Sequence, residues 1–474
     1  MMHRNGRSLT AVAAMGLVGL ALTACGGSEC PSPDLATRLA AARSGDVVSI
    51  AGCAPVRGHF VVPGGVTLAG PGTIEGDGAT AVTLETGAGQ TTTLREVTIV
   101  SATSGSGVIA GIEARGEGTA VLDAASVEAR VGVAAALGAA HQEVRDCHFR
   151  GEVTATNASD TRWLAPRASS EATHGVIVSR GTLSLTASEI VGFPEIGLGL
   201  GAAQGTMTVG EVDATVTTTT FGHGLGVAIS SSARTLALTD VRIEALETGV
   251  RGWPSYALLL VDGDVTSERL SIADADGFGI VEVAGSSSHR ALAIDRTGDV
   301  GIWAGTDVSL TVSEGSHLTG TSFAAITAVD AAGLSVSDTT IDGVRVVRRV
   351  VGVRGAIDVG DGIDLVGTSP TLARVAIAGA GRAGLVADRS TLAPERITET
   401  SVQAEGTSLG AVVGDIDRAG ESFTAVSVPG WDQGITRLGT AAANDAAFTA
   451  TLAVSVAAMP PSLGSALGVI APMY

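Results

Sequence analysis

The apolar residues of this chain follow a short pattern that starts at a glycine and, in its cleanest copies, returns after 21 to 24 residues. One full copy is Gly175–Leu200, with one short strand at residues 175–178 and a second at 183–190, in which Leu183 and Leu185 alternate with polar residues. Alternation with a period of two, rich in β-branched residues, is typical of strands. A fixed period of this length predicts a solenoid, in which each unit buries its face against its neighbours. Other copies start at Gly111, Gly132, Gly197, Gly224, Gly279, Gly301, Gly362, Gly384, Gly410 and Gly434, with an alanine version at Ala325.

A second strand recurs with the same period. Its pattern is an apolar residue, another residue three positions later and an apolar residue two positions after that, as at Leu185, Ser188 and Ile190. Leucine-rich repeats have a similar period but need a recurrent asparagine, and the chain has three asparagines. Propeller blades need about 40 residues each. We therefore expect an all-β, single-stranded parallel β-helix of roughly 15 to 18 coils, stacked about 4.8 Å apart.

A short helix is expected before the first strand. Residues 31–43 have helical spacing, because Leu35 and Leu39 share one face and Ser32 or Asp34 can cap the first turn. A helix at this place would cover the free edge groups at the end of the stack.

The order of the first elements resembles that of a known superfamily. The helix is followed by Val47–Ile50 and then by Gly64–Leu68, which is similar to the amino-terminal cap and first coils of right-handed parallel β-helix proteins of the pectate-lyase-like superfamily. The resemblance implies a right-handed β-helix, and we place it at residues 34–455. Residues 456–474 lose the repeat and are expected to form a carboxy-terminal cap or tail.

The first residues have the features of an export signal. Two arginines precede an apolar run over residues 9–22, and the following Leu22-Thr23-Ala24-Cys25 resembles the lipobox of bacterial lipoproteins. That resemblance implies a signal peptide at residues 1–24, a lipid on Cys25 and a tether at 25–33. An ordinary secretory signal is the alternative. Gly26 and the glycine after it provide no acidic retention signal, so we expect an exported lipoprotein of the bacterial cell envelope, at the outer membrane.

Export to an oxidising compartment bears on the remaining cysteines. Cys30 and Cys53 are predicted to form a disulfide that closes a short amino-terminal loop. Cys147 falls where other copies of the repeat have a small residue, so we expect it to be a buried structural thiol.

Charge and composition exclude several functions. The formal net charge is −19, all 29 basic residues are arginine, and aromatic residues make up 3% of the chain. Such an acidic surface repels phosphate backbones, so nucleic acid is not an expected partner. The absence of lysine from the sequence excludes Schiff-base chemistry.

The repeat itself predicts a ligand groove. Within each glycine-led strand the residue between the two apolar positions points away from the core. A tryptophan there can stack on a sugar ring, and charged groups can bind hydroxyls or a uronate carboxylate. The alternative is an ordinary surface around a half-covered tryptophan. The rule puts outside Arg251, Trp303, Thr327 and Asp364, with Glu282 close by.

Acidic turns before the strands suggest a second site. Asp276, Asp299 and Asp361 occur at similar offsets in three coils and could hold calcium through their oxygens. Arg296, beside Asp299, would then be the nearest base or anion clamp. This arrangement resembles the acidic calcium ligands and basic residue of pectate lyases. The alternative is ordinary turn chemistry, because aspartate beside glycine favours turns.

A third candidate is His223. It lies in Phe221-Gly222-His223-Gly224, which resembles the Gly-His-Gly element of polygalacturonases. The aspartate pair that precedes this element in that family does not occur here, and the Arg-x-Lys that follows it needs a lysine. A turn histidine is therefore the alternative interpretation.

Together these observations favour a lipid-anchored β-helix that binds polysaccharide or another envelope component and has no assured catalytic centre or cofactor. The competing hypothesis is a polysaccharide lyase or glycoside hydrolase that acts on an acidic polysaccharide at the exposed face. Fold alone does not decide between them, and the sequence leaves the oligomeric state open.

Overall fold

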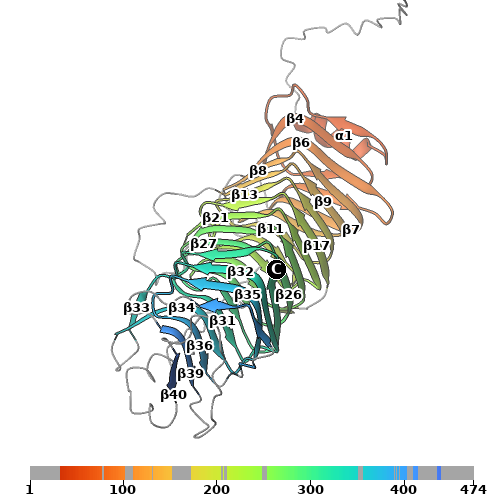
Figure 1. The fold of residues 1–474 in the computed structure, drawn as a ribbon. Helices are drawn as coiled ribbons and strands as arrows, with labels where there is room; N and C mark the ends of the chain where they lie inside the picture. Colours follow the sequence, from red (N-terminus) through yellow and green to blue (C-terminus); the bar gives the residue numbers. More distant parts are fainter. Residues whose placement is uncertain are drawn as a thin grey trace, which may run out of the picture.

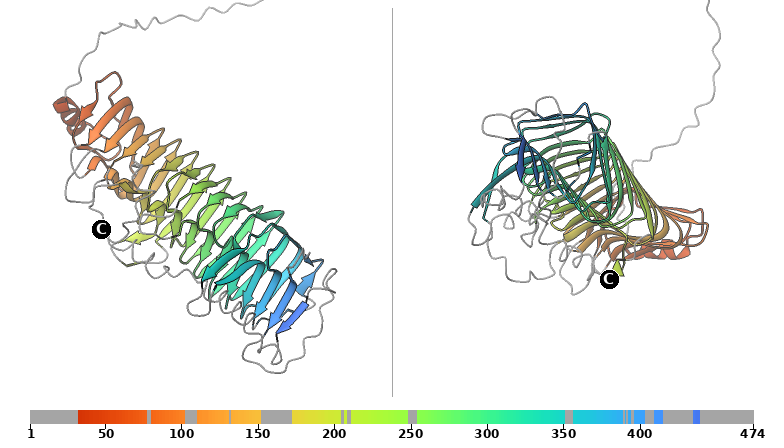
Figure 2. Two further views of the ribbon diagram at one scale, coloured as in Figure 1. Left: turned by 90° about the vertical axis from the view of Figure 1, so that its left-hand side faces the viewer. Right: turned by 60° about the horizontal axis from the view of Figure 1, so that its bottom comes forward.

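The computed structural model is a rod of stacked coils (Figures 1 and 2). Neighbouring coils are joined by parallel strand pairs over almost the whole rod, so that 38 strands form one continuous hydrogen-bonded system. Each coil contributes to three sheets, called A, B and C in chain order. The predicted parallel β-helix is therefore confirmed. The described residues are 32–76, 80–101, 110–130, 132–151, 172–203, 206–207, 211–247, 254–350, 356–388, 390, 392–393, 396–402, 409–414 and 435–438.

The three sheets run the length of the rod. Sheet A contains fifteen described strands: β3 (Phe60–Val62), β5 (Thr80–Thr86), β7 (Ala110–Asp123), β9 (Gly132–Arg145), β11 (Ala172–Val178), β14 (Ile196–Leu200), β19 (Val227–Ser231), β22 (Tyr256–Leu260), β25 (Phe278–Glu282), β28 (Ile302–Ala304), β31 (Phe323–Val329), β34 (Ala356–Val366), β36 (Ala383–Asp388), β39 (Leu409–Gly414) and β40 (Ile435–Leu438). This number agrees with the predicted number of coils.

Sheet B contains β1 (Val47–Ser49), β4 (Thr67–Gly76), β6 (Thr91–Ser101), the second halves of β7 and β9, β12 (Gly181–Thr186), β17 (Val212–Thr217), β20 (Thr235–Thr239), β23 (Asp264–Glu268), β26 (Gly285–Arg290), β29 (Val308–Ser313), β32 (Gly333–Asp342), β35 (Pro370–Ala378) and β37 (Ile397–Thr398). Sheet C contains β2 (Val56–Arg57), the ends of β4, β6, β32 and β35, and β8 (Ser126–Ala129), β10 (His148–Gly151), β13 (Glu189–Val191), β18 (Thr220–Gly222), β21 (Arg242–Leu246), β24 (Ser271–Ala275), β27 (Ala293–Thr297), β30 (Ser316–Thr319) and β38 (Ser401–Val402). Outside the sheets, β15 (Ala202–Ala203) pairs with β16 (Thr206–Met207), and β33 (Val347–Val350) forms an antiparallel hairpin with the start of β34.

Helix α1 (Ser32–Ala41) lies at the amino-terminal end of the rod (Figure 1). Its Leu35 and Leu39 are each 2% exposed and belong to the same core as the first coils. The predicted capping helix and its apolar face are confirmed. No described helix has the length and apolar character needed to cross a membrane.

The interior is filled by stacked aliphatic side chains. On sheet A, Leu258, Ile280, Ile302 and Ile326 occupy one inward position on consecutive strands, and all four are fully buried. Full burial of a side chain of this size contributes about 1.5–3 kcal/mol relative to exposure. The core is therefore built from aliphatic residues, as the composition indicates.

Sheets B and C meet at a corner where most of the described coils have a residue in the left-handed region. Asp240 and Arg269 have φ values of 54° and 53° there. The residue that follows this position is buried, and in one coil the hydroxyl of Ser188 donates to the carbonyl of Thr186 at 2.9 Å. Cys147 has the same place in its coil as a free, fully buried thiol, and burial raises its pKa to about 12. It is the inert core thiol that we expected.

Candidate functional site

The predicted groove residues on sheet A do stack in one row. Val281 pairs with Trp303, Trp303 with Thr327, and Thr327 with Asp364 in the register of consecutive strands. The row is not an open groove, however, because Trp303 is 2% exposed and Thr327 and Asp364 are 0% exposed. Alternation identifies the side of the wall to which a side chain points, but it does not tell whether that side meets water. The prediction of an exposed ligand groove is wrong at these residues.

The other end of the predicted row needs a second correction. We expected Arg251 on the sheet A strand of its coil, but that strand is β22, so Leu259 occupies the row. Arg251 lies outside the described residues, as does the export signal with Cys25 and Cys30. The Cys30–Cys53 disulfide therefore stays a prediction.

The outer side of sheet A has an apolar cluster of its own. Tyr256 and Phe278 stack with ring centroids 5.5 Å apart and an interplanar angle of 10°. We call the whole set the outer A cluster. Its buried members are Ile196, Val227, Tyr256, Leu259, Phe278, Val281, Val300, Trp303, Phe323, Ala324 and Val359.

Glu282 does not belong to the outer row at all, because it follows outward Val281 and lies 2% exposed on the inner side of the wall. Its Oε1 is 2.9 Å from His289 Nε2, and its Oε2 accepts a hydrogen bond from Ser287 at 2.6 Å. His289 Nδ1 is 2.8 Å from the hydroxyl of Ser267 on the preceding coil. We did not predict this core network from the sequence. The signal for it was the pair of polar residues, Ser287 and His289, at inward positions of β26.

Asp361 also has a structural partner. It is fully buried, and Arg382 Nε on the next coil donates to its Oδ1 at 2.8 Å while Nη2 contacts Oδ2. Burial raises the pKa of Asp361, and the bidentate guanidinium opposes that effect. The calcium-ligand role predicted for Asp361 is not compatible with this ion pair. Arg382 is a residue of the outer wall that sequence reasoning missed.

The other two predicted calcium ligands lie in separate turns. Asp276 is exposed after β24, whereas Asp299 is half-buried after β27 and its Oδ1 accepts from the backbone of Val300 at 3.1 Å. Within the described ranges, no group of three His, Cys, Asp or Glu residues is placed to hold a metal ion. The structure thus does not bring the predicted aspartates together.

Arg296 lies at an exposed corner of sheet C. Its Nε donates to Asp274 Oδ1 on the preceding coil at 2.6 Å, and its Nη1 contacts Asp295. These hydrogen bonds and charges raise the pKa of Arg296 further and lower that of Asp274. The guanidinium is thus engaged by two carboxylates, and the role of Arg296 as a base or anion clamp stays a prediction.

His223 is an exposed turn residue with φ 36°, and its carbonyl accepts from Gly192 N at 2.8 Å. It follows β18, whereas Arg296 lies in β27, three coils along sheet C. Three coils correspond to roughly 14 Å. The candidate catalytic residues His223, Arg296 and Asp299 therefore do not form one constellation.

The exposed face of sheet B is chemically more distinctive. At its central outward position, Ser184, Thr215, Ala237, Thr266, Ser288, Thr311, Ser335 and Thr371 follow one another in register. The neighbouring outward positions add more hydroxyls, and these side chains are exposed or half-exposed. We call this surface the hydroxyl face; its additional members are Thr182, Thr186, Thr217, Thr235, Thr239, Ser286, Ser309, Ser313 and Ser337.

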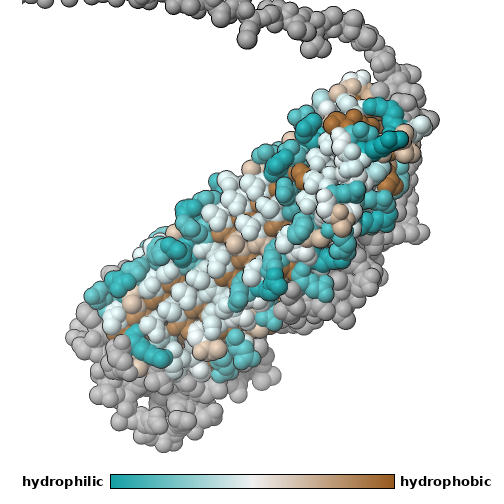
Figure 3. Space-filling view, turned by 90° about the vertical axis from the view of Figure 1, so that its right-hand side faces the viewer, coloured by the Kyte–Doolittle hydropathy of each residue, from teal (hydrophilic) through white to brown (hydrophobic). Residues whose placement is uncertain are grey.

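The hydroxyl face is bordered by paired charges. Figure 3 shows the side of the rod on which β17 and β26 lie, with pale and apolar residues running between hydrophilic edges. At the corner toward sheet C, Arg269 Nε donates to Asp240 at 2.6 Å and Arg374 Nε donates to Asp338 at 2.5 Å. These bonds lower the pKa of both aspartates. The border toward sheet C is therefore made largely of ion pairs, and the carboxylates of Asp213 and Asp264 stand among the hydroxyls of one outward row.

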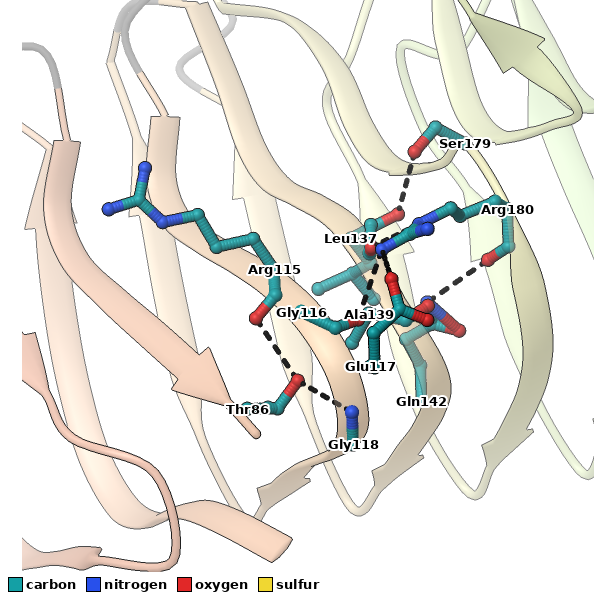
Figure 4. A network of polar contacts seen from close by, with 11 residues as sticks. Thr86, Arg115, Gly116, Glu117, Gly118, Leu137, Ala139, Gln142, Ser179 and Arg180 are labelled. Atoms are coloured by element: carbon teal, nitrogen blue, oxygen red, sulfur yellow. Dashed lines mark hydrogen bonds and ion pairs between the residues drawn. The ribbon is translucent and has the colours of Figure 1, made fainter. Parts of the chain in front are cut away.

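The corner between sheets A and B is held by a polar network (Figure 4). Arg180 Nη2 donates to Glu117 Oε1 at 2.9 Å and to the carbonyl of Gly116 at 3.1 Å, while its Nε donates to the carbonyl of Gly138 at 2.9 Å. One guanidinium thus joins three consecutive coils. Close by, Thr86 Oγ1 donates to the Arg115 carbonyl at 3.0 Å. Such contacts fix the coil-to-coil register on which the hydroxyl rows depend.

Comparison with known proteins gives little further information. No protein-family model matches the chain. No curated protein sequence matches it either. Among solved structures, the chain is similar to a mannuronic acid specific polysaccharide family 6 lyase from human gut microbiota, with a TM-score of 0.31, 9% identity, and coverage of 93% of this chain and 96% of that chain. A likeness of this degree carries no argument about function, so the functional question depends on the surfaces described above.

Proposed function

We propose that this protein is a lipid-anchored cell-envelope β-helix that binds polysaccharide along its hydroxyl face. The observation that carries the proposal is the register of Ser and Thr hydroxyls on successive strands of sheet B. Neighbouring strands repeat every 4.7–4.9 Å or so, so the face offers a regular series of hydrogen-bonding groups to a polymer that is itself regular.

The chemistry of the face suits a hydroxyl-rich ligand. Each Ser or Thr hydroxyl can both donate and accept, as sugar hydroxyls do. One such bond contributes only about 0.5–1.5 kcal/mol, so affinity requires many coils acting together. The strands are rigid, which limits the entropy lost on binding. The net charge of −19 disfavours phosphate polymers as competing ligands.

A catalytic function is the weaker proposal. Polysaccharide lyases and glycosidases need an acid and a base that converge on one bond. Arg296 is engaged by Asp274, and His223 lies three coils away from it. Incubation with a panel of polyuronides, with and without calcium, tests this alternative. New reducing ends or unsaturated products that disappear in Asp299→Ala would establish an enzyme.

The membrane anchor is proposed from the sequence alone. Leu22-Thr23-Ala24-Cys25 supports lipidation of Cys25, and the glycines after it support the outer membrane as the destination. In a bacterial host, Cys25→Ser should move the protein from the membrane fraction to the soluble fraction. Continued membrane association of this variant would contradict the anchor.

Binding is tested by removing hydroxyls without changing side-chain shape. The triple variant Thr215→Val, Thr266→Val and Thr311→Val removes a hydroxyl from every second strand along the central row of the hydroxyl face. We expect at least about tenfold weaker binding to purified peptidoglycan sacculi and to soluble polyuronides in cosedimentation and affinity electrophoresis. The matched control is Thr98→Val, at an exposed position of sheet C.

The control should bind like the unmodified protein, and all variants should have the same β-sheet circular dichroism. Equal binding by the triple variant and the control would show that the hydroxyl face is not the binding surface. Absence of binding to every polysaccharide tested would remove the proposed function as a whole.

A further inference from the structure

The corner between sheets B and C carries a charged ridge along six consecutive coils. Each coil places a charged side chain there, at the left-handed corner position or, in the coil of Arg290, one residue before it. We call this row the BC ridge; its members in chain order are Asp240, Arg269, Arg290, Glu314, Asp338 and Arg374. Their side chains are 40–55% exposed, so the ridge is accessible to a partner.

Ion pairs within the rod use only some of the hydrogen-bonding groups of the BC ridge. Arg374 donates to Asp338 from Nε at 2.5 Å and from Nη2 at 2.7 Å. Arg290 donates to Glu314 from Nη2 at 2.7 Å. A guanidinium has five N–H donors, and the other N–H groups of these two arginines have no protein partner within the described ranges. Each arginine can therefore bind a second carboxylate without losing the first.

The order of charges along the BC ridge is self-complementary. From Asp240 to Arg374 the signs are negative, positive, positive, negative, negative and positive. The same order results when the ridge is followed from the other end and every sign is reversed. A two-fold rotation about an axis perpendicular to the rod, between the coils of Arg290 and Glu314, therefore brings opposite charges of two copies together. Parallel rods in the same register would instead bring like charges together, which is repulsive.

We propose that the BC ridge is the contact between two antiparallel copies of this protein. A two-fold contact uses the same patch of both copies, so it requires a patch that complements itself, as this ridge does. The opposing pairs are Asp240 with Arg374, Arg269 with Asp338, and Arg290 with Glu314, and each pair forms twice. Glu268 also lies beside the ridge, but it contacts Arg269 within the same rod and is not an unpaired charge at the contact.

The surfaces beside the BC ridge allow two rods to approach. Most outward residues next to it are small and uncharged, namely Thr239, Ser313, Ser337 and Ala373 on sheet B, and Ser271, Ala293, Thr340 and Ala376 on sheet C. Arg242 and His317 are the larger members of the row on sheet C. The rotation places Arg242 opposite Ala376 and His317 opposite Ala293, so neither meets a like charge.

The contact should be weak and sensitive to salt. The ridge spans five steps between coils, which is roughly 24 Å. Exposed ion pairs are individually weak, and salt screens them. In sedimentation velocity runs we therefore expect the purified protein to dimerise at about 0.01 M ionic strength, where the Debye length is roughly 30 Å, and to be monomeric at about 1 M.

The test changes the contact without breaking the ion pairs within each rod. In the swap variant Asp240→Arg with Arg269→Asp, the two side chains can still pair with each other. Aspartate and arginine both occupy this left-handed position in the unmodified protein, at φ 54° and 53°. The rotation now places the new arginine against Arg374 and the new aspartate against Asp338 of the second copy. Self-association at low ionic strength should therefore be at least about tenfold weaker.

A second swap supplies the matched control. Asp338→Arg with Arg374→Asp should weaken self-association to the same extent. The quadruple variant that combines both swaps should restore it, because opposing charges then change sign together. An equimolar mixture of the two swap variants should form a mixed dimer, since the charges of one match those of the other.

Circular dichroism spectra equal to that of the unmodified protein establish that all variants are folded. An unmodified protein that stays monomeric at low ionic strength would overturn the proposal. Swap variants that dimerise as well as the unmodified protein would overturn it in favour of another surface. A quadruple variant that stays monomeric while folded would also contradict it, because the two-fold pairing requires the restored contact.

Discussion

The same coils build the outer faces of sheets A and B, yet the two faces differ in residue type and in exposure to water. On sheet A the outward row holds Leu259, Val281 and Trp303, all nearly inaccessible to water. On sheet B they hold residues such as Thr215 and Thr266, which are exposed. The difference teaches that the period of a strand reveals which residues share a side, while their size and chemistry reveal whether that side is covered.

The described aromatic residues are divided between the two layers. Aromatic side chains bury large areas, so they are effective at sealing a second layer. The inner core is mostly Leu, Ile, Val and Ala, but it also holds Phe60, Phe149, Phe193 and Phe221. A large aromatic outward residue in a β-helix is therefore better interpreted as a sign of a covered face than as a sugar platform.

The largest contrast between the two faces should appear in stability. Trp303→Ala removes a buried aromatic side chain and should lower the free energy of unfolding by about 4 kcal/mol. Thr266→Ala, at an exposed outward position of sheet B, should change it by less than about 0.5 kcal/mol. Urea unfolding followed by circular dichroism measures both. Similar midpoints for the two variants would contradict the distinction between a covered and an open face.

The core network between the two sheets should give the next largest effect. His289→Leu leaves the carboxylate of Glu282 buried without its main partner and should cost about 3 kcal/mol. Adding Glu282→Leu removes that uncompensated charge, so the double variant should recover part of the loss. A double variant less stable than His289→Leu would show that packing, and not the buried charge, dominates here.

The smallest effect is expected at the borders of the hydroxyl face and depends on pH. Arg269 and Arg374 lower the pKa of Asp240 and Asp338 below 3.8 in the folded protein. A carboxyl with a depressed folded pKa stabilises the protein above its unfolded pKa and loses that contribution as pH falls through the lower folded value. Stability should therefore decline below pH 3.8 or so, and less steeply in the double variant Arg269→Met and Arg374→Met. Melting temperatures measured from pH 5 to about 2 with equal slopes would contradict this.

Much of the fold could be predicted from the sequence, because each coil repeats the same local rules. The glycine-led strands, the helix with Leu35 and Leu39, and the buried place of Cys147 all follow from residues within one coil of their neighbours. The candidate site could not be predicted in the same way. Whether Trp303 is open depends on what lies outside the wall, which is a relation between distant segments that a period does not encode. Glu282, by contrast, occupies the second inward position of its glycine-led strand, so the alternation itself places it inside.

The corner residues with positive φ, and Arg180 with its hydrogen bonds to the two preceding coils, limit how such a rod can change in length. Because these contacts join equivalent points of neighbouring coils, removal of a whole coil preserves the register, whereas the turns differ in length: Ile302 pairs with Ile326, and Ile326 pairs with Ile363. Residues 279–300 form such a unit, and it carries both Glu282 and His289. Loss of that unit would remove the acid and its histidine together and bring Ser267 opposite Val312. This coil is thus a cassette that carries its buried acid and histidine together, unlike the ion pair of Asp361 and Arg382, which spans two coils.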